Sequence, residues 1–369
     1  MRVVLFVHSL VSDWNHGNAH FLRGIVAELD ARGHEVRVLE PRDGWSRANL
    51  VADHGEAPLR HFRERFPRLR SLLYDLESLD LGRALDGADV VLVHEWNPPE
   101  LVRRLGERRR AGSFRLLFHD THHRAVTAPA EMARYDLSGY DGVLAFGRIL
   151  RDLYRERGWA ERAWTWHEAA DTRVFRPLPP DRERRDLVWI GNWGDGERTA
   201  ELQEFLLEPA QALGLSGTVH GVRYDDEARG AVARSGLAYG GWLPNAEAPR
   251  VFGSHRVTVH VPRRPYVQAL PGIPTIRPFE ALACGIPLVS APWEDVEGLF
   301  RAGEDHLVAR NGAEQRRYLE AVLQDDELAA SLARRGLETI RARHTCSHRV
   351  DELLAICAEL DGSPAEEAA

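Results

Sequence analysis

Residues 2–39 read RVVLFVHSLVSDWNHGNAHFLRGIVAELDARGHEVRVL, and this stretch predicts the fold of the first half of the chain. Val3–Val7 is a continuous apolar and β-branched run, which is typical of a strand buried on both faces. A polar, glycine-containing loop follows at residues 9–18. Apolar residues at helical spacing come next, and Gly33 ends this helix before a second strand at Val36–Leu39. The order is that of a βαβ unit, so we expect a parallel sheet.

The same order of strand, glycine loop and helix begins again in the second half of the chain. Leu187–Ile190 is the strand, and residues 191–198, GNWGDGER, are the loop. We therefore predict an α/β protein with two doubly wound, Rossmann-like domains facing across a cleft that receives the carboxyl ends of the strands. Further buried strands are expected at Val90–Val93, Phe114–Phe118, Val143–Phe146, Thr218–His220, Val257–His260, Leu288–Ser290 and His306–Val308.

Proline and charge mark the division between the two predicted domains. Residues 176–186, RPLPPDRERRD, are rich in both and form the expected linker. Residues 1–175 are then the N-terminal domain and residues 187–343 the C-terminal domain. Residues 344–361 are expected to form a closing helix, with packing against the N-terminal domain as one option. The small and acidic residues 362–369 are expected to be a disordered tail.

The composition excludes several classes of function. The 369 residues include 48 basic and 56 acidic side chains, and the net charge of −8 argues against a nucleic-acid partner. All 48 basic residues are arginine. The lack of lysine excludes a Schiff-base lysine, a Walker lysine and the lysine of kinase-type enzymes. Any bound phosphate must therefore be held by arginine and by backbone N–H groups.

The cysteines and the apolar runs indicate the compartment. Cys284, Cys346 and Cys357 form no C-x-x-C pair, which indicates a reducing environment without a disulfide framework or a zinc ribbon. The N-terminal apolar run is too short for a signal peptide, and no stretch approaches the roughly 18 apolar residues of a membrane span. We expect a cytoplasmic protein without a transmembrane segment.

The segment with the most chemical signals is Pro271–Trp293, PGIPTIRPFEALACGIPLVSAPW. Thr275–Ala283 is expected to form a helix, whose N-terminus offers free N–H groups and a favourable dipole to an anion. Thr275 and Arg277 add a hydroxyl and a guanidinium, and the Glu280 carboxylate can accept two ribose hydroxyls. This arrangement suits a nucleoside diphosphate. The alternative is a capped surface helix in which Glu280 only complements the dipole.

Arg277–Pro287, RPFEALACGIP, resembles the nucleotide-sugar signature of GT-B glycosyltransferases of the family-four-like clan. It is most similar to the spore-maturation-protein type, with its R-x-F-E-A-L-A-x-G-x-P pattern. Weaker similarity extends to Asp141–Phe175 and His344–Val350, so the resemblance reaches both domains. It implies a GT-B fold, a metal-independent and retaining sugar transfer, and contact of Glu280 with ribose. Many relatives carry another glutamate eight positions earlier, where this chain has Gly272, so the contact with the donor sugar is unassigned.

Two further segments of the second domain are candidates for donor binding. The glycines of loop 191–198 let the backbone approach a ligand closely, and Arg198 can pair with a diphosphate, as relatives with an arginine here imply. Trp242, in the turn GGWLP, can stack on the nucleobase or can be an ordinary buried turn residue. The predicted donor-binding residues are Gly191, Asn192, Arg198, Trp242, Leu243, Gly272, Ile273, Pro274, Thr275, Arg277 and Glu280.

The first domain is expected to bind the acceptor through loops that follow its strands, at residues 14–20, 94–97 and 119–124. In the first of these loops, backbone N–H groups can face the phosphates. The alternative there is a simple N-cap by Asn18 with a solvated His20. The predicted acceptor-side residues are His16, Gly17, Asn18, His20, His94 and Glu95.

The run His119–Arg124, HDTHHR, follows a buried strand and is the candidate for acid–base chemistry. Adjacent histidines point in different directions and no pair has i, i+4 spacing, so the run does not predict a metal site. A histidine held by Asp120 can act as the general base on the acceptor hydroxyl, or the run can bind the acceptor without proton transfer. The candidate catalytic residues are His119, Asp120 and His122.

These features predict a glycosyltransferase that moves a sugar from a nucleotide-sugar, its co-substrate, to a hydroxyl acceptor, with no cofactor and no metal. In a retaining reaction a phosphate oxygen takes the acceptor proton; in an inverting reaction one of the candidate catalytic residues does. Two alternatives remain open. One is a nucleotide-sugar epimerase of the same fold. The other is a non-catalytic nucleotide- or carbohydrate-binding scaffold, which the missing second glutamate supports.

Overall fold

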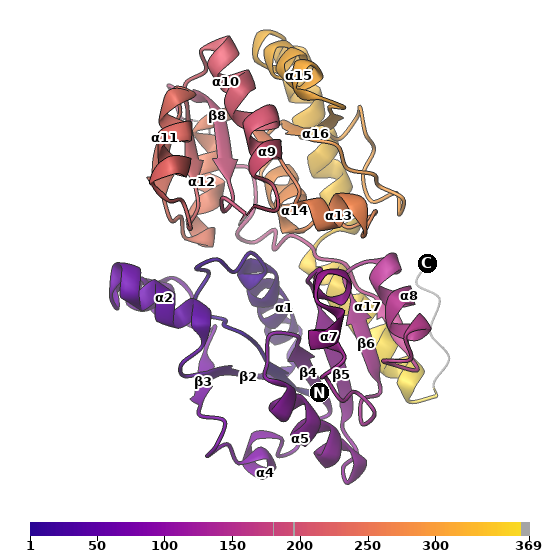
Figure 1. Ribbon diagram of the computed structural model, residues 1–369. Coiled ribbons are helices and arrows are strands. Elements are labelled where there is room, and N and C mark those ends of the chain that lie inside the picture. Colours follow the sequence, from indigo (N-terminus) through magenta and orange to yellow (C-terminus); the bar gives the residue numbers. More distant parts are fainter. Residues whose placement is uncertain (180, 195, 363–369) are drawn as a thin grey trace. The chain divides into compact units, whose positions relative to one another are not determined.

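The structure, a computed structural model, describes residues 1–362 except 180 and 195. The chain forms two compact units, Met1–Glu168 with Cys346–Ala369, and Ala169–Thr345. Each unit contains one parallel sheet with flanking helices (Figure 1). The expected linker at residues 176–186 thus falls within the second unit, and the last helix falls within the first. The tail predicted to be disordered lies, from residue 363 on, outside the described residues.

The first unit is built on a seven-stranded parallel sheet with the strand order β3-β2-β1-β4-β5-β6-β7. Its strands are β1 (Arg2–Phe6), β2 (Glu35–Pro41), β3 (Ser71–Tyr74), β4 (Val90–His94), β5 (Arg115–Asp120), β6 (Gly142–Ala145) and β7 (Ala163–Thr165). Its helices are α1 (Ala19–Ala31), α2 (Trp45–His54), α3 (Ala57–Arg65), α4 (Leu81–Ala84), α5 (Pro99–Arg110), α6 (Arg124–Thr127), α7 (Pro129–Met132), α8 (Arg148–Glu156) and α17 (Cys346–Leu360).

Helix α17 returns from the end of the chain to pack on α1 of the first unit. The Arg32 side chain, just past α1, pairs with Asp351 and donates to the hydroxyl and the carbonyl of Ser347. The indole N–H of buried Trp166 donates to the carbonyl oxygen of Arg349 at 2.8 Å. Strand β1 and helix α17 therefore belong to the same unit.

The second unit is built on a six-stranded parallel sheet with the strand order β10-β9-β8-β11-β12-β13. Its strands are β8 (Arg185–Ile190), β9 (Gly217–His220), β10 (Ala238–Gly241), β11 (His255–His260), β12 (Leu288–Ser290) and β13 (Leu307–Val308). Its helices are α9 (Thr199–Leu202), α10 (Glu208–Leu213), α11 (Asp226–Arg234), α12 (Ala248–Gly253), α13 (Arg264–Gln268), α14 (Ile276–Ala283), α15 (Gly312–Gln324) and α16 (Asp326–Arg343), with a π-turn at Gln203–Leu207 and a 3₁₀-turn at Asn245–Glu247.

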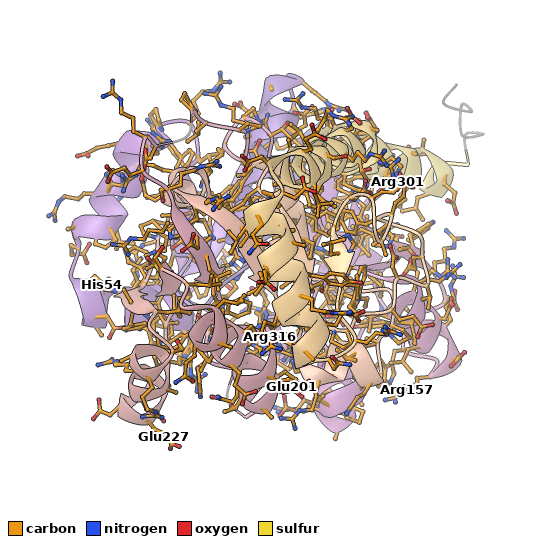
Figure 2. The ribbon with its side chains drawn as sticks, turned by 90° about the horizontal axis from the view of Figure 1, so that it is seen from above. His54, Arg157, Glu201, Glu227, Arg301 and Arg316 are labelled. Atoms are coloured by element: carbon orange, nitrogen blue, oxygen red, sulfur yellow. The ribbon has the colours of Figure 1, made fainter. Side chains whose placement is uncertain are left out.

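Apolar strands form the core of both sheets. In β1, Val3–Phe6 is buried throughout, and in β8 the buried part is Leu187–Ile190. Continuous apolar runs of this kind are typical of parallel sheets that helices cover on both faces. Charged side chains lie on the helices, such as Glu227 on α11 and Arg316 on α15 (Figure 2). Among the described residues, no helix combines the length and the hydropathy needed to cross a membrane.

In each sheet, successive strands of the chain are added first on one side of the initial strand and then on its other side. The switch point is therefore between β1 and β4 in the first unit and between β8 and β11 in the second. In open parallel sheets, ligands bind outside the carboxyl ends of the strands at such a point. The loops that follow these four strands are therefore where each unit is built to hold a ligand.

The predicted fold class, with two doubly wound parallel sheets, is confirmed. Two strands, β3 and β7, were not predicted. The strand β7 has only three residues, too few for a recognisable pattern. The edge strand β3 is only partly buried and lacks a continuous apolar pattern.

Candidate functional site

The loop after β8 is fixed to the neighbouring strand β9. The Gly191 N–H donates to the His220 carbonyl at 2.8 Å, and the Tyr224 hydroxyl donates to the Gly191 carbonyl at 2.8 Å. The side-chain oxygen of Asn192 accepts the Val222 N–H at 3.1 Å. These contacts hold Gly191 and Asn192, both predicted donor-binding residues, at the switch point of the second sheet.

The side chain of Arg198 folds back over this loop. Its Nη2 donates to the Asn192 carbonyl at 2.6 Å and its Nη1 to the Val261 carbonyl at 3.2 Å, while the guanidinium lies 5.1 Å from the centre of the Trp189 ring. Gly194, with φ of +99°, makes room, since a Cβ there would lie 2.6 Å from Cγ of Arg198. The buried Nε of Arg198 has no hydrogen-bond partner among the described residues.

Three arginines gather around this position. Burial, with Arg263 and Arg277 nearby, lowers the pKa of Arg198 to about 9. Arg263 forms an ion pair with Glu197 at 2.5 Å, and Arg277 pairs with Glu280. Within the described part of the chain, Arg198 has no carboxylate at ion-pair distance. The cluster therefore holds one positive charge more than its ion pairs neutralise, and a bound anion would relieve it.

Helix α14 begins beside this cluster with an unusual backbone. Thr275 precedes it with φ of +60°, a conformation that is costly for a β-branched residue, and its side chain forms no capping hydrogen bond. Glu280 is fully buried within the helix. A helix start without a side-chain cap, next to arginines, favours an anion at its N-terminus.

Position 272 has no room for a side chain unless its neighbours move. Gly272 has φ of +92°, and a Cβ there would lie 2.9 Å from side-chain carbons of Val296 and of Glu297. Ile273 and Pro274, which follow, are buried. A side chain at this position, such as the glutamate of the resembled pattern, would therefore require Val296 and Glu297 to move.

The turn after β10 holds the predicted base-contacting residues. Gly241 has φ of +70°, and its carbonyl accepts the Gly221 N–H at 2.9 Å. Leu243 packs against the apolar core that includes Phe252, and Trp242 is half-buried. The stacking of Trp242 on a nucleobase stays a prediction.

Two residues of this region were missed by the sequence analysis, His260 and Arg263. His260 ends β11, is buried, and its Nδ1 lies 3.0 Å from Oγ of Ser290. Burial and the nearby His306 and Arg198 lower the pKa of His260 to about 3. The sequence did contain a usable signal for His260. A polar residue at the carboxyl end of a buried strand, next to a switch point, lies at the edge of the sheet where ligands bind. His260 was interpreted only as part of a strand.

In the first unit, two buried charged side chains hold the loop after β1. The Glu40 carboxylate accepts the Ser9 hydroxyl at 2.9 Å and the Leu10 N–H at 2.6 Å. Arg23 donates to the Leu10 carbonyl at 2.8 Å and forms an ion pair with Asp13 at 2.9 Å. The loop that leads to the predicted residues at 16–20 is therefore tightly fixed from both sides.

The predicted residues at the start of α1 lie in different environments. Gly17 is exposed, and Asn18 stands at the N-cap position of α1 without capping it. Its amide instead donates to the hydroxyl of Thr121. His20 is 3% exposed, so the alternative with a solvated His20 is wrong.

Four buried histidines line the carboxyl ends of β1, β4 and β5. The ring centres are 5.1 Å apart for His8 and His16, 6.1 Å for His16 and His94, and 5.4 Å for His94 and His119. Burial lowers the pKa of His8 to about 4 and that of His119 to about 3, and it takes the pKa values of His16 and His94 well below the usual range. All four rings are neutral at pH 7.

Two buried carboxyl groups lie beside these histidines. Asp120 accepts the Tyr154 hydroxyl at 2.7 Å and the His122 N–H at 3.0 Å, and burial raises its pKa to about 6. Burial and the neighbouring Asp120 raise the pKa of Glu95 well above its usual range. Nε2 of His94 lies 3.0 Å from the Glu95 carboxylate.

The candidate catalytic residues differ in access. His119 is 3% exposed and packs against Phe21 and Trp166, with ring centres 6.0 and 4.8 Å away. His122 is half-buried, and its ring centre lies 5.0 Å from that of Trp96, itself 41% exposed. Of the three candidates, His122 alone has a side chain that is not fully buried. Among the described residues, no three His, Cys, Asp or Glu side chains are grouped so that they could hold a metal ion.

Part of the chain, most of it in the second unit, matches a protein-family model. Residues 198–355, which are less than half of the chain, match a family model described as glycosyl transferase-like. The match begins at Arg198 and includes Arg277 and Glu280. No curated protein matches the chain significantly in sequence.

Solved structures match the whole chain in fold. Sucrose-phosphate synthase from Thermosynechococcus elongatus aligns with a TM-score of 0.65 and 15% identity, covering 98% of this chain and 99% of that chain. HepE from Anabaena, in complex with UDP and glucose, aligns with a TM-score of 0.67 and 13% identity, covering 96% and 99%. An alpha-glucosyltransferase in complex with UDP and a 13-mer DNA aligns with a TM-score of 0.68 and 11% identity, covering 97% and 100%.

The fold is therefore that of GT-B glycosyltransferases, with two Rossmann-like domains, and this prediction is confirmed. The family model and the structural matches support the predicted enzyme class, a nucleotide-sugar-dependent glycosyltransferase. Membership of the spore-maturation-protein type stays a prediction.

Proposed function

We propose that this protein transfers a sugar from a nucleotide-sugar donor to a hydroxyl acceptor, with retention of configuration and without a metal ion. The observation that carries the proposal is the arginine cluster at the switch point of the second unit. Arg198 has no carboxylate partner there among the described residues, and its pKa is lowered to about 9. A diphosphate is the anion that suits several guanidinium groups beside a helix N-terminus.

The donor site follows from these residues. Arg198, Arg263 and Arg277 bind the diphosphate, together with N–H groups at the start of α14. Glu280, already paired with Arg277, accepts hydroxyls of the ribose. Trp242 and Leu243, after β10, contact the base. UDP is the first nucleotide to test, because two of the similar solved structures are complexes with UDP.

Charge stabilisation is the main chemical task of the second unit. As the bond from the sugar to the diphosphate breaks, negative charge grows on the departing oxygen. Guanidinium groups and helix N–H groups already in place stabilise that charge, and each charge-assisted hydrogen bond contributes about 1.5–3 kcal/mol. No metal ion and no cofactor are required for this step. In the proposed retaining reaction, an oxygen of the departing phosphate takes the proton of the acceptor.

The first unit supplies the surface for the acceptor. Its histidines are neutral, so they offer hydrogen bonds to hydroxyl groups without repelling or attracting charge. The net charge of −8 speaks against a nucleic-acid acceptor. The three cysteines are buried and form no C-x-x-C pair, which favours a reducing compartment, and we propose the cytoplasm.

The test is turnover of a nucleotide-sugar by the purified full chain. UDP-sugars and GDP-sugars are incubated with mixed sugar and aromatic-alcohol acceptors, and products are detected by mass spectrometry. The proposal predicts release of the nucleoside diphosphate with a glycosylated acceptor, whose anomeric configuration, measured by NMR, matches that of the donor. An isomerised donor without acceptor would instead identify an epimerase. Binding without any turnover would identify a scaffold.

A further inference from the structure

Two tryptophans of the first unit expose their side chains at the carboxyl edge of its sheet. Trp45 is 45% exposed and Trp96 is 41% exposed, whereas every other Trp, Tyr or Phe of the described residues is buried or half-buried. Trp45 follows β2 as the first residue of α2, and Trp96 comes two residues after β4. Large apolar rings are costly to expose to water, so two of them at one edge indicate a binding surface.

The two tryptophans belong to a row of four aromatic side chains, Trp45, His8, Trp96 and His122. The ring centres are 6.0 Å apart for Trp45 and His8, 6.2 Å for His8 and Trp96, and 5.0 Å for Trp96 and His122. The four residues follow β2, β1, β4 and β5, which are neighbours in that order in the sheet. This aromatic row therefore crosses the switch point of the first unit, over about 14 Å at the usual strand spacing.

Other side chains fix both tryptophans in place. Trp45 packs edge to face with buried Trp14, with ring centres 5.1 Å apart, and the Trp14 indole N–H donates to Asp53 of α2 at 2.8 Å. The guanidinium of Arg124 lies over the ring of Trp96, 4.1 Å from its centre. Both indoles are therefore ordered before a ligand binds, which lowers the entropic cost of binding.

The aromatic row alternates apolar and polar rings, because an imidazole follows each indole. Burial lowers the pKa of His8 to about 4, so the imidazole between the two tryptophans is neutral at pH 7. A sugar ring has a similar alternation. Its C–H groups pack on the negative face of an aromatic ring, and its hydroxyl groups form hydrogen bonds with imidazole nitrogens.

A flat aromatic alcohol fits the row less well than a sugar does. It would cover the indoles, but it would also displace water from the imidazole nitrogens and offer few hydrogen bonds in return, which is costly. The alternation of the row therefore favours a carbohydrate. Trp45 and Trp96 lie on different strand ends with His8 between them, so each indole can receive its own sugar ring.

We propose that the aromatic row binds an oligosaccharide as the acceptor, with one sugar ring stacked on Trp45 and another on Trp96. The inference rests on the proposed function, since it names the chemical class of the hydroxyl acceptor in that reaction. It assigns the two tryptophans to acceptor specificity and gives them no part in binding the nucleoside diphosphate.

The test measures transfer by the full chain to saccharides of increasing length. Glucose, mannose and N-acetylglucosamine, with their disaccharides and trisaccharides, are offered beside 4-nitrophenol as the aromatic alcohol. Each is combined with UDP-sugars and GDP-sugars, and release of the nucleoside diphosphate gives the rate. The best trisaccharide should exceed its monosaccharide about tenfold in kcat/KM, because a second sugar ring is stacked.

Two alanine variants test the tryptophans directly. Trp45→Ala and Trp96→Ala should each raise the KM of the best oligosaccharide about tenfold, while the KM of the donor changes less than twofold. Trp45→Phe and Trp96→Phe keep an aromatic face and should recover part of the loss. Thermal unfolding shows whether each variant is folded, and the phenylalanine variants allow the comparison if an alanine variant is not.

The matched control is Trp159→Ala. Trp159 is half-buried between α8 and β7, and its ring centre lies 5.5 Å from that of Tyr154. Because α8 runs back from the carboxyl end of β6 to the amino end of β7, Trp159 is at the opposite edge of the same sheet. This variant should leave the KM of both substrates unchanged.

Several results would overturn the inference while the proposed function stands. They are transfer to 4-nitrophenol but to no saccharide, equal kcat/KM for the trisaccharide and its monosaccharide, or an oligosaccharide KM in the tryptophan variants equal to that of Trp159→Ala. Equal losses for donor and acceptor would show a structural role. A lower molecular mass of the variants in light scattering would identify the row as a contact between copies of the chain. If no pair of substrates releases a nucleoside diphosphate, the proposed function itself fails, and the inference fails with it.

Discussion

The two units have the same doubly wound sheet but very different charge at their switch points. In the second unit, three arginines gather where β8 and β11 end, and burial and the other two arginines lower the pKa of Arg198 to about 9. In the first unit, four neutral histidines and two buried carboxyl groups surround the ends of β1, β4 and β5. There, the charged side chains of Glu40 and Arg23 form hydrogen bonds with the loop after β1 of the same unit.

Under the proposed function, this difference adapts one scaffold to two kinds of ligand. A cluster of cations is stabilised by an anion, which is why we assign the diphosphate to the second unit. Neutral imidazoles in a fixed loop can bind hydroxyl groups, which carry no charge, so we assign the acceptor to the first unit. The strand order around each switch point is the same, so the proposed difference in ligand depends on the side chains at the strand ends.

Arg198→Met should have the largest effect, because it removes a buried charge that has no carboxylate partner among the described residues. Affinity for the nucleoside diphosphate should fall by about 100-fold or more, which corresponds to the loss of one or two charge-assisted hydrogen bonds. Calorimetric titration measures it. The matched control is Arg250→Met, on α12, whose arginine side chain is 74% exposed. Equal affinity in Arg198→Met and the control would contradict the anion site.

Glu280→Gln should have the next largest effect. Its carboxylate is fully buried and pairs with Arg277, and we assign it to the ribose hydroxyls. Affinity for the diphosphate should fall by roughly ten- to a hundredfold, or about 1.5–3 kcal/mol. Glu314→Gln on α15 also removes a buried glutamate that pairs with an arginine, Arg310, and should leave the affinity unchanged. A folded Glu280→Gln variant with normal affinity would disprove the ribose assignment.

His8→Asn tests whether the histidines of the first unit are neutral. The pKa of His8 is about 4 in the folded protein, below the ordinary 6.5, so the unfolded chain binds its proton first as the pH falls. Folding stability is therefore lost from pH 6.5 down to about 4. Asp120 has the opposite effect. Its pKa of about 6 in the folded protein is above the ordinary 3.8, so the folded chain binds this proton first and gains stability as the pH falls. In His8→Asn, the slope of the unfolding free energy between pH 6 and pH 5 should be smaller by up to about 1.4 kcal/mol per pH unit. Urea titrations measure this slope, and an unchanged slope would mean that His8 is protonated in the fold.

His122→Ala should have the smallest effect. In a retaining reaction the departing phosphate takes the acceptor proton, so removal of this half-buried imidazole should lower turnover less than about tenfold. A loss of about 10²–10⁴ in kcat would instead identify His122 as a general base and favour inversion. Steady-state kinetics on the product assay, together with the anomeric configuration, separate the two cases.

Much of the fold could be predicted from local pattern. Buried strands such as Val90–Val93 are continuous apolar runs, and the helix predicted within residues 344–361 is α17 (Cys346–Leu360). The strand β7 could not be predicted, because its three residues are too few for a pattern and its pairing with β6 is a tertiary contact. Helix α15, which begins after an Asn311 cap, was not singled out although its cap was a usable signal.

The site could be predicted only where a motif existed. Arg198, Arg277 and Glu280 are in or next to recognisable segments, and the structure brings Arg198 and Arg277 together. Arg263 and His260 have no motif, and their importance depends on which strand ends are neighbours in space. The partners of Glu40 and Arg23 could not be foreseen either, since they lie up to 31 residues away along the chain.

The central claim is that the second unit binds a nucleoside diphosphate through arginine. The most direct measurement is the thermal shift of the full chain with UDP, GDP, dTDP, ADP and CDP, with and without magnesium, beside Arg198→Met. One diphosphate should stabilise the unmodified chain by about 2.7 kcal/mol at 100 times its Kd, independently of magnesium, and Arg198→Met should lose this stabilisation. No stabilisation by any diphosphate, or the same stabilisation in Arg198→Met, would contradict it.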